Sequence, residues 1–299
     1  MHYLISGLVV ASEITLTGVA DPEKTGLEPD VRIERGRLPE TLDQVTLRGP
    51  NWMISGDDFL LHIPGVARMR VRSGREIIVD VENAEADTVP FLLGTGFGVL
   101  LHQRGTLALH ASAVARDGRA IAICGPSGMG KSTLSAALCQ AGCSFVSDDI
   151  SVVRFEADGC PWVLPDSRQH RLWIDAVERL SLSQRQGGAV RETIEKYHVD
   201  PSGESAAMPL SKILVLRTAE SRGQEAVIEP LGLSDAAALL RSDVYRSALA
   251  SRMELDAALF GQIARLLGHV SAYRLTRPQE IEKLEEVVTL VQKHLFEAC

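Results

Sequence analysis

The segment GPSGMGKS at residues 125–132 holds the side chains best suited to chemistry on a phosphate group. It fits the pattern GxxxxGK[ST] at every fixed position. Glycines allow the backbone to curl until consecutive N–H groups point at phosphate oxygens. Lys131 adds a mobile positive charge for the outer phosphates, and Ser132 offers a hydroxyl to Mg²⁺. The motif therefore predicts a nucleotide site that takes Mg²⁺, and the absence of a guanine-reading NKxD motif favours ATP.

The whole loop and the first turn after it are expected to surround the phosphates. The predicted nucleotide contacts are Gly125, Pro126, Ser127, Gly128, Met129, Gly130, Lys131, Ser132 and Thr133. A loop of this kind serves ATPases, GTPases and kinases alike, so it does not name a reaction.

Two adjacent carboxylates, Asp148 and Asp149, follow the mainly apolar stretch CSFVS. This stretch predicts a buried strand, and ligands of α/β sheets bind at the carboxyl ends of strands. One carboxylate can hold Mg²⁺, and the other can accept the proton of an attacking hydroxyl. The alternative is an aspartate pair that only caps a helix or closes a turn.

Three further side chains are candidates for the same site. His110 is placed in a strand just before the strand that leads into the loop, where it could orient groups near the γ-phosphate. Phosphoryl transfer also needs cations for the charge that develops on oxygen, and Arg171 and Lys196 are the candidates that would face the substrate. The alternatives are a core histidine and solvated surface charges.

The elements that must position these residues follow a change of pattern along the chain. Residues 1–88 contain short alternating stretches such as DFLLHI and REIIVDV, which predict a β-rich N-terminal domain that docks substrate or only packs against the rest. Residues 89–105 predict a helix or a buried connector. A strand–loop–helix–strand pattern then carries the phosphate loop, and residues 233–299 are predicted to be mainly helical.

The last predicted helix is opened by Pro278 and has apolar residues at 281, 284, 288, 291 and 295. That stripe predicts a core-facing helix, with the seam of a homo-oligomer as the alternative.

Composition limits the class of protein. The chain has 299 residues, a net charge of −8 and 45% hydrophobic residues, which suits a large core and argues against nucleic acid as a partner. Its apolar runs are shorter than a membrane span, and the N-terminus lacks the basic residues of a signal peptide. We therefore expect a cytoplasmic protein that does not bind membranes.

Taken together, the loop, the Asp-Asp pair and the upstream histidine resemble the HPr kinase/phosphorylase family. His110 precedes Lys131 by 21 residues, Asp148 follows it by 17, and the loop reads GxSGxGKS as it does in that family. The resemblance implies an α/β fold with a P-loop core related to HPr kinase and phosphoenolpyruvate carboxykinase, in which residues 89–299 form the kinase domain. It also implies transfer of a phosphoryl group from ATP to a serine hydroxyl.

Carried over by position, the resemblance gives each residue a role. Lys131 contacts the phosphates, Ser132 contacts the metal, Asp148 is the general base, and Asp149 and His110 support it. From the residues themselves we further expect Asp149 to help Ser132 position Mg²⁺, directly or through water.

The sequence departs from the family at Thr133, where a glutamate usually stands, and lacks the family's second, glycine-rich signature. In roughly the place of that signature stands RQHRLWIDAV, where Asp175 could supply a metal ligand. The lead-in LHQRG…LHASAV and the LW-DA segment resemble a branch encoded with ribosomally made peptides such as lasso peptides. This resemblance implies a serine of a peptide or small protein as acceptor. The alternatives are HPr itself, a free metabolite such as serine, an ATPase coupled to assembly, or a nucleotide-binding regulator without transfer chemistry.

Overall fold

The N-terminal part of the chain is a β-sheet whose orientation follows from simple alternation. The computed structural model describes residues 1–19, 27–166, 168–191, 194–201, 206–219, 224–278 and 280–296. Eight strands lie in the order β1-β2-β3-β8-β7-β6-β5-β4. They are β1 His2–Ile5, β2 Leu8–Ser12, β3 Val31–Arg35, β4 Leu47–Arg48, β5 Trp52–Ser55, β6 Asp58–Ile63, β7 Ala67–Arg72 and β8 Glu76–Val81. In β7, Ala67, Met69 and Val71 are buried and the arginines between them are more exposed, so one face of the sheet packs inward.

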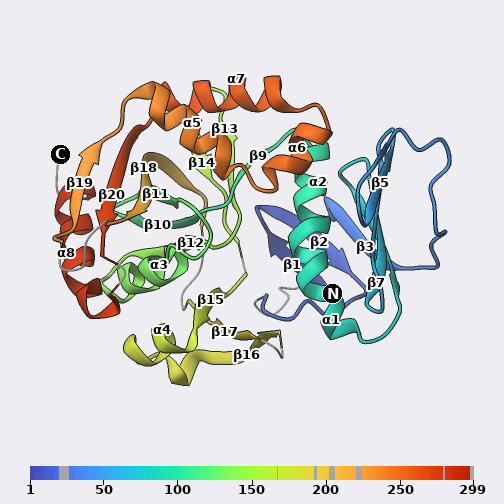
Figure 1. Cartoon of the computed structure of the whole chain (residues 1–299), viewed down its shortest axis with the longest axis horizontal. Coiled ribbons are helices and arrows are strands. Elements are labelled where there is room, and N and C mark those ends of the chain that lie inside the picture. The colour runs from blue at the N-terminus through green and yellow to red at the C-terminus, as the bar shows by residue number, and fades with distance from the viewer. Residues whose placement is uncertain are drawn as a thin grey trace.

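A helical rod follows this sheet and confirms the helix predicted for residues 89–105. It consists of α1 Glu85–Phe91, a π-helical turn Leu92–Gly96 and α2 Phe97–Gln103. Leu93, Phe97 and Leu100 share one hydrophobic cluster with the sheet and with Ile150 and Tyr245 from later in the chain. In Figure 1 the rod runs in front of β1 and β2, with β3, β5 and β7 to its right and the phosphate-loop region to its left. The sheet therefore shares its core with the phosphate-loop region.

The second sheet carries the phosphate loop. Its path is β12-β10-β11-β18-β14-β13-β9, and β20 joins β18 to β19. The strands are β9 Leu107–Leu109, β10 Ser112–Arg116, β11 Arg119–Cys124, β12 Ser144–Ser147, β13 Ser151–Phe155, β14 Pro161–Val163, β18 Met208–Thr218, β19 Val227–Pro230 and β20 Ser271–Arg277. Because β11, β18 and β20 run parallel, their carboxyl ends meet at one edge, where ligands of such sheets bind.

Helices cover both faces of this sheet, as the alternation in β11 requires. Ile121 and Ile123 pack with α3 Lys131–Gln140 and α8 Leu284–Leu295. Ala120 and Ala122 face the other way, toward α5 Leu233–Asp243 and α7 Asp256–Leu267. The short α6 Ser247–Arg252 connects the latter two and reaches the rod. The phosphate-loop region is therefore a three-layer α/β structure (Figure 1).

The C-terminal prediction holds in part. Leu284, Val288, Val291 and Leu295 of α8 are buried in the core, which confirms a core-facing stripe. The helix does not begin at Pro278, because a 3₁₀ turn at Ile281–Lys283 precedes it. The region is also not only helical, since β20 is a parallel strand next to β18. Its sequence, SAYRLTR, lies between two helices and carries two arginines, which hid the strand.

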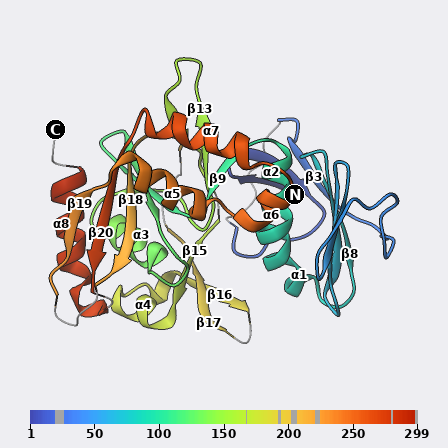
Figure 2. The same cartoon turned by 45° about the horizontal axis from the view of Figure 1, so that its top comes forward.

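A small third sheet lies beside α3, as Figure 2 shows at the lower edge of the molecule. It is formed by β15 His170–Trp173, β17 Ile194–Val199 and β16 Gln186–Arg191, with α4 Ile174–Arg179 and a 3₁₀ turn Ser183–Arg185 between them. Across the part of the chain that the structure describes, no helix is long and apolar enough to span a membrane.

One buried ion pair joins the N-terminal sheet to the segment that leads into β15. Arg168 and Asp166 form a salt bridge, and both side chains are almost fully buried. The Arg168 guanidinium also donates to Ser6 Oγ at 2.8 Å, in the turn between β1 and β2. Its Cζ lies 5.9 Å from the centre of the Phe97 ring in α2. Arg168 is thus a structural cation that holds the β1–β2 turn, α2 and this segment together.

Candidate active site

The phosphate loop runs from the end of β11 to the start of α3. Gly125 has a φ of +132°, and a Cβ there would lie 3.0 Å from the Leu216 carbonyl oxygen, so the turn requires glycine. Gly130 has a φ of +78° and occupies the N-cap position of α3. The predicted contacts between these glycines, Pro126, Ser127 and Gly128, are exposed. The unpaired N–H groups at the start of α3 and its positive dipole end therefore face an open loop, which suits an anion.

Met129 and Thr133 flank the helix start and are partly buried. The Met129 carbonyl accepts a 2.7 Å hydrogen bond from the guanidinium of Arg277, at the carboxyl end of β20. Arg277 is 8% exposed and is held against the loop backbone. Sequence reasoning missed Arg277 because it also missed β20.

Lys131 is folded back over the loop. Its Nζ donates to the carbonyl oxygens of Gly125 at 2.7 Å and of Pro126 at 3.2 Å. Burial lowers the pKa of Lys131, although the nearby carboxylate of Asp243 opposes that shift. The ammonium therefore lies against the loop backbone, within a side-chain rotation of any phosphate held there.

Asp148 is the buried centre of the site. Its Oδ1 accepts hydrogen bonds from Ser132 Oγ at 3.0 Å and from Ser112 Oγ at 2.5 Å. Its Oδ2 accepts the backbone N–H of Arg171 at 3.3 Å and lies 3.6 Å from His170 Nδ1. Burial alone would raise the pKa of Asp148, but His170 and the two hydroxyls outweigh it and hold that pKa well below its usual range. Asp148 therefore stays ionised.

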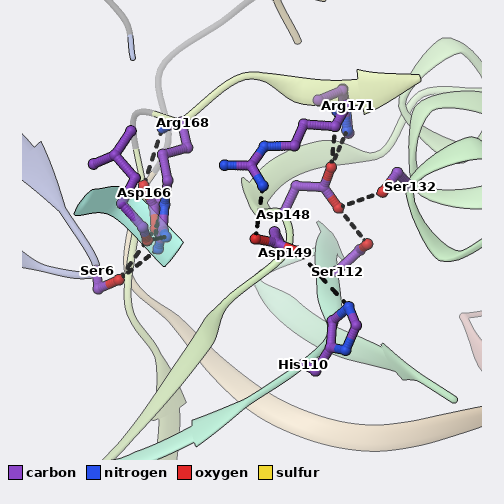
Figure 3. Close-up of polar contacts among 11 residues, drawn as sticks. Ser6, His110, Ser112, Ser132, Asp148, Asp149, Asp166, Arg168 and Arg171 are labelled. Atoms are coloured by element: carbon purple, nitrogen blue, oxygen red, sulfur yellow. Dashed lines mark hydrogen bonds and ion pairs between the residues drawn. The ribbon is translucent and has the colours of Figure 1, made fainter. Parts of the chain in front are cut away.

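Asp149 turns away from its neighbour because its backbone is left-handed, with a φ of +68°. Its Oδ2 accepts a 3.0 Å hydrogen bond from Arg171 Nη1, and its Oδ1 lies 3.7 Å from His110 Nε2 (Figure 3). Burial would raise the pKa of Asp149, but the charges of Arg171, His110 and Arg168 lower it. The Asp149 side chain is 22% exposed, so of the two carboxylates it is the one that faces solvent.

The sequence interpretation placed Ser132 and Asp149 together on Mg²⁺, and the structure shows a different direct contact for the Ser132 hydroxyl. The Ser132 hydroxyl meets Asp148, which points back toward the start of α3. The left-handed backbone at Asp149 directs the two carboxylates to different partners, Asp148 to Ser132 and Asp149 to Arg171. No pattern of residues in the sequence predicts this turn.

His110 lies between β9 and β10, and not within a strand as predicted. Its backbone N–H donates to the Asp243 carbonyl oxygen at 2.7 Å, and its ring meets the Tyr245 ring edge-on at 6.0 Å. These contacts place a one-third-exposed imidazole beside Asp149, whereas the sequence interpretation expected it to support Asp148.

Of the two predicted substrate cations, Arg171 lies at the site through both its backbone and its guanidinium. Lys196 lies in β17 opposite Trp173, and its side chain is outside the described part of the chain. Asp175 lies at the start of α4 and accepts the N–H of Ala176.

Sequence reasoning also missed Ser112, His170 and Asp243. Ser112 follows His110 by two residues, and His170 directly precedes Arg171. Both therefore lie next to predicted site residues, and this proximity in sequence was the available signal. Asp243 ends α5, and its carboxylate accepts the N–H of Gly125. Burial raises the pKa of Asp243 to about 6, although Lys131 and that hydrogen bond oppose the shift. It is far from the motif in sequence, so nothing could have pointed to it.

The donor set fits Mg²⁺. Ser132 and Asp148 offer hard oxygen atoms beside the loop, and Mg²⁺ in nucleotide sites is held by one or two protein oxygens together with phosphates and water. Within the described ranges, no group of three or more His, Cys, Asp or Glu side chains could hold a metal ion by itself. The oxygen atoms of Ser132 and Asp148 fit a Mg²⁺ that phosphates and water also bind.

Comparisons with known proteins found similarity to solved structures alone. No family model matches this sequence, and a search of curated proteins found no relative. A search of solved structures found the Hpr(Ser) kinase/phosphatase from Coxiella burnetii, which is 15% identical, with 64% of this chain and 91% of that chain covered. The TM-score of that match is 0.31.

Proposed function

We propose that the chain is an ATP- and Mg²⁺-dependent kinase that phosphorylates a serine of a peptide or small protein. The observation that carries this proposal is the junction at Asp148 and Asp149. One carboxylate is bonded to the Ser132 hydroxyl at the start of α3, and its neighbour opens to solvent beside His110 and Arg171. A protein that only binds nucleotide needs no proton acceptor beside the loop.

The loop and Lys131 bind the donor. Residues 125–130 present backbone N–H groups, α3 presents its positive end, and Lys131 leaves the carbonyl oxygens of Gly125 and Pro126 to reach the outer phosphates. Arg277 stabilises the loop by donating a hydrogen bond to the Met129 carbonyl oxygen.

Ser132 and Asp148 would hold Mg²⁺, which when bound neutralises charge on the phosphates. This assignment exchanges the roles that the sequence analysis predicted for the two aspartates. Asp148 suits the metal because it is buried, ionised and bonded to Ser132.

Asp149 is assigned as the general base. The acceptor serine approaches from the solvent side, and its hydroxyl oxygen forms the new bond to the γ-phosphorus while the bond to the β–γ bridging oxygen breaks. Asp149 takes the hydroxyl proton, and ADP leaves with the bridging oxygen. Arg171 and His110 orient Asp149, and the Arg171 guanidinium is placed for charge that develops on the transferring group.

Intact mass spectrometry tests the proposal. Serine-containing peptides, any short peptide encoded beside the gene, HPr and free serine are incubated with the protein and Mg-ATP, with Asp149→Asn as control. We expect a gain of one phosphate on a peptide that the control does not produce. A gain on free serine alone would replace the peptide by a metabolite, and ATP binding without any phosphorylated product would support a regulator or an ATPase instead.

A further inference from the structure

A cleft of about 740 Å³ opens between the N-terminal sheet and α6. One wall carries Trp52, at the start of β5, and Phe91, at the end of α1. The opposite wall is the segment from Ser242 to Arg252, which includes α6. The volume is in the range of about 300–1,000 Å³ that is typical of ligand sites.

This cleft leads directly to the candidate active site. His110 is one of its lining residues, and His110 Nε2 lies 3.7 Å from the Asp149 carboxylate. Ser242 and Val244 also line it, and Asp243 between them accepts the N–H of Gly125 in the phosphate loop. A molecule in the cleft therefore lies beside His110, which contacts the proposed base Asp149. It also lies beside Ser242 and Val244, the two neighbours of the residue that contacts the phosphate loop.

The charge of the cleft is opposite to that of the protein. Two permanently charged residues line it, Arg246 and Arg252, and both are exposed. Its lining contains no Asp or Glu. The whole chain has a net charge of −8, so an acid-free cleft with two arginines is a local exception. The Arg246 guanidinium lies 5.6 Å from the centre of the Tyr245 ring, which keeps it at the cleft wall. Apolar surface comes from Trp52, Phe91 and Leu249.

We propose that this cleft seats the acceptor as a peptide segment that carries acidic and apolar side chains beside its serine. The inference rests on the proposed kinase function and names its substrate class. A free serine would fill only a small part of such a volume and would leave the aromatic wall unused. An acidic peptide instead pairs its carboxylates with Arg246 and Arg252, packs apolar side chains on Trp52 and Phe91, and delivers its serine to Asp149 past His110.

The test is a binding selection that needs no phosphoryl transfer. A displayed library of peptides with a fixed serine and randomised flanks is selected on the full-length protein in the absence of ATP. Three variants are selected in parallel: Arg246→Glu/Arg252→Glu, Ala248→Trp, and the control Arg32→Glu/Arg119→Glu. Ala248 is exposed and lines the cleft, so a tryptophan there obstructs the cleft beside α6. Arg32 and Arg119 are exposed outside the cleft and match the charge change of the double variant.

We expect the wild type and the control to enrich serine peptides with acidic and apolar flanks. The Arg246→Glu/Arg252→Glu variant should bind those peptides about tenfold or more weakly by fluorescence anisotropy, and should enrich basic flanks instead. The Ala248→Trp variant should lose the peptides but bind a fluorescent ATP analogue as the wild type does, which shows that it is folded. Enrichment without acidic flanks, or full peptide binding by Ala248→Trp, would overturn the proposal.

The same reagents separate this inference from the kinase itself. If the selected peptides bind in the cleft but none gains a phosphate, the docking site stands and the kinase function fails. If a peptide is phosphorylated and Ala248→Trp leaves its kcat/KM unchanged, the kinase stands and the cleft is not its acceptor site.

Discussion

The two adjacent aspartates should fail in different ways when each is replaced by asparagine. Asp148 accepts bonds from two hydroxyls on one oxygen and from the backbone N–H of Arg171 on the other. An asparagine keeps one oxygen for the Arg171 N–H, and its amide nitrogen can donate to the two hydroxyls only if both turn round. Three charge-assisted hydrogen bonds then become neutral ones, which are about half as strong, so we expect Asp148→Asn to lose about 2–4 kcal/mol of unfolding free energy.

Asp149→Asn should be far milder for the fold. The Asp149 side chain is partly exposed, and an asparagine oxygen can still accept from Arg171 Nη1. The loss of its charged contact with Arg171 is that of a partly solvated pair, about 1 kcal/mol or less. Transfer should nevertheless fall by about 10²–10⁴-fold, because the proton acceptor is gone.

Three assays separate the roles. Chemical denaturation gives the unfolding free energies, titration of a fluorescent ATP analogue with and without Mg²⁺ gives the metal-dependent part of binding, and mass spectrometry gives transfer. Asp149→Asn should keep Mg²⁺-dependent binding, whereas Asp148→Asn should lose it. Our assignment is refuted if Asp149→Asn turns over at nearly the normal rate while Asp148→Asn still binds nucleotide in a Mg²⁺-dependent way. That result would support the roles predicted in the sequence analysis, with Asp148 as the general base and Asp149 on Mg²⁺.

Three more predictions concern the loop and its neighbour. Lys131→Ala should weaken ATP binding and transfer together, because the mobile charge is lost; unchanged affinity in a fluorescence titration would argue against the loop assignment. Gly125→Ala should lower the unfolding free energy by about 1–3 kcal/mol, since its φ of +132° and its 3.0 Å approach to the Leu216 carbonyl exclude a side chain; an unchanged thermal midpoint would contradict this. Asp243→Asn should stabilise the nucleotide-free protein at pH 8. The pKa of Asp243 is raised to about 6 in the folded protein, so the folded protein binds a proton at Asp243 more tightly than the unfolded chain does. The ionised Asp243 carboxylate therefore destabilises the fold increasingly between pH ~4 and pH ~6, and to its full extent above pH ~6. The gain at pH 8, about 2–3 kcal/mol, should disappear below pH ~4 in denaturation experiments, and a gain of equal size at both pH values would be inconsistent with this explanation.

Much of the fold was predictable because local patterns are also the patterns of burial. The alternation in DFLLHI and REIIVDV became β6 and β8, and the strand–loop–helix around residues 119–142 became β11, the loop and α3. β20 was missed because its arginines and its place between two helices disguise a strand that is stabilised by pairing with β18. Pairing partners distant in sequence leave no local signal.

The sequence by itself determined the loop, its glycines and the presence of two carboxylates, because these depend on residue type and on short spacing. Only the tertiary structure decided which carboxylate meets which partner. The left-handed turn at Asp149, the hydroxyl of Ser112 from β10 and the arrival of Arg171 from β15 come from three segments whose approach is set by sheet packing. The same packing brought Asp243 under the loop and opened the cleft beside His110. Contacts between distant segments follow from how whole layers bury their apolar faces, which a list of residues and spacings does not contain.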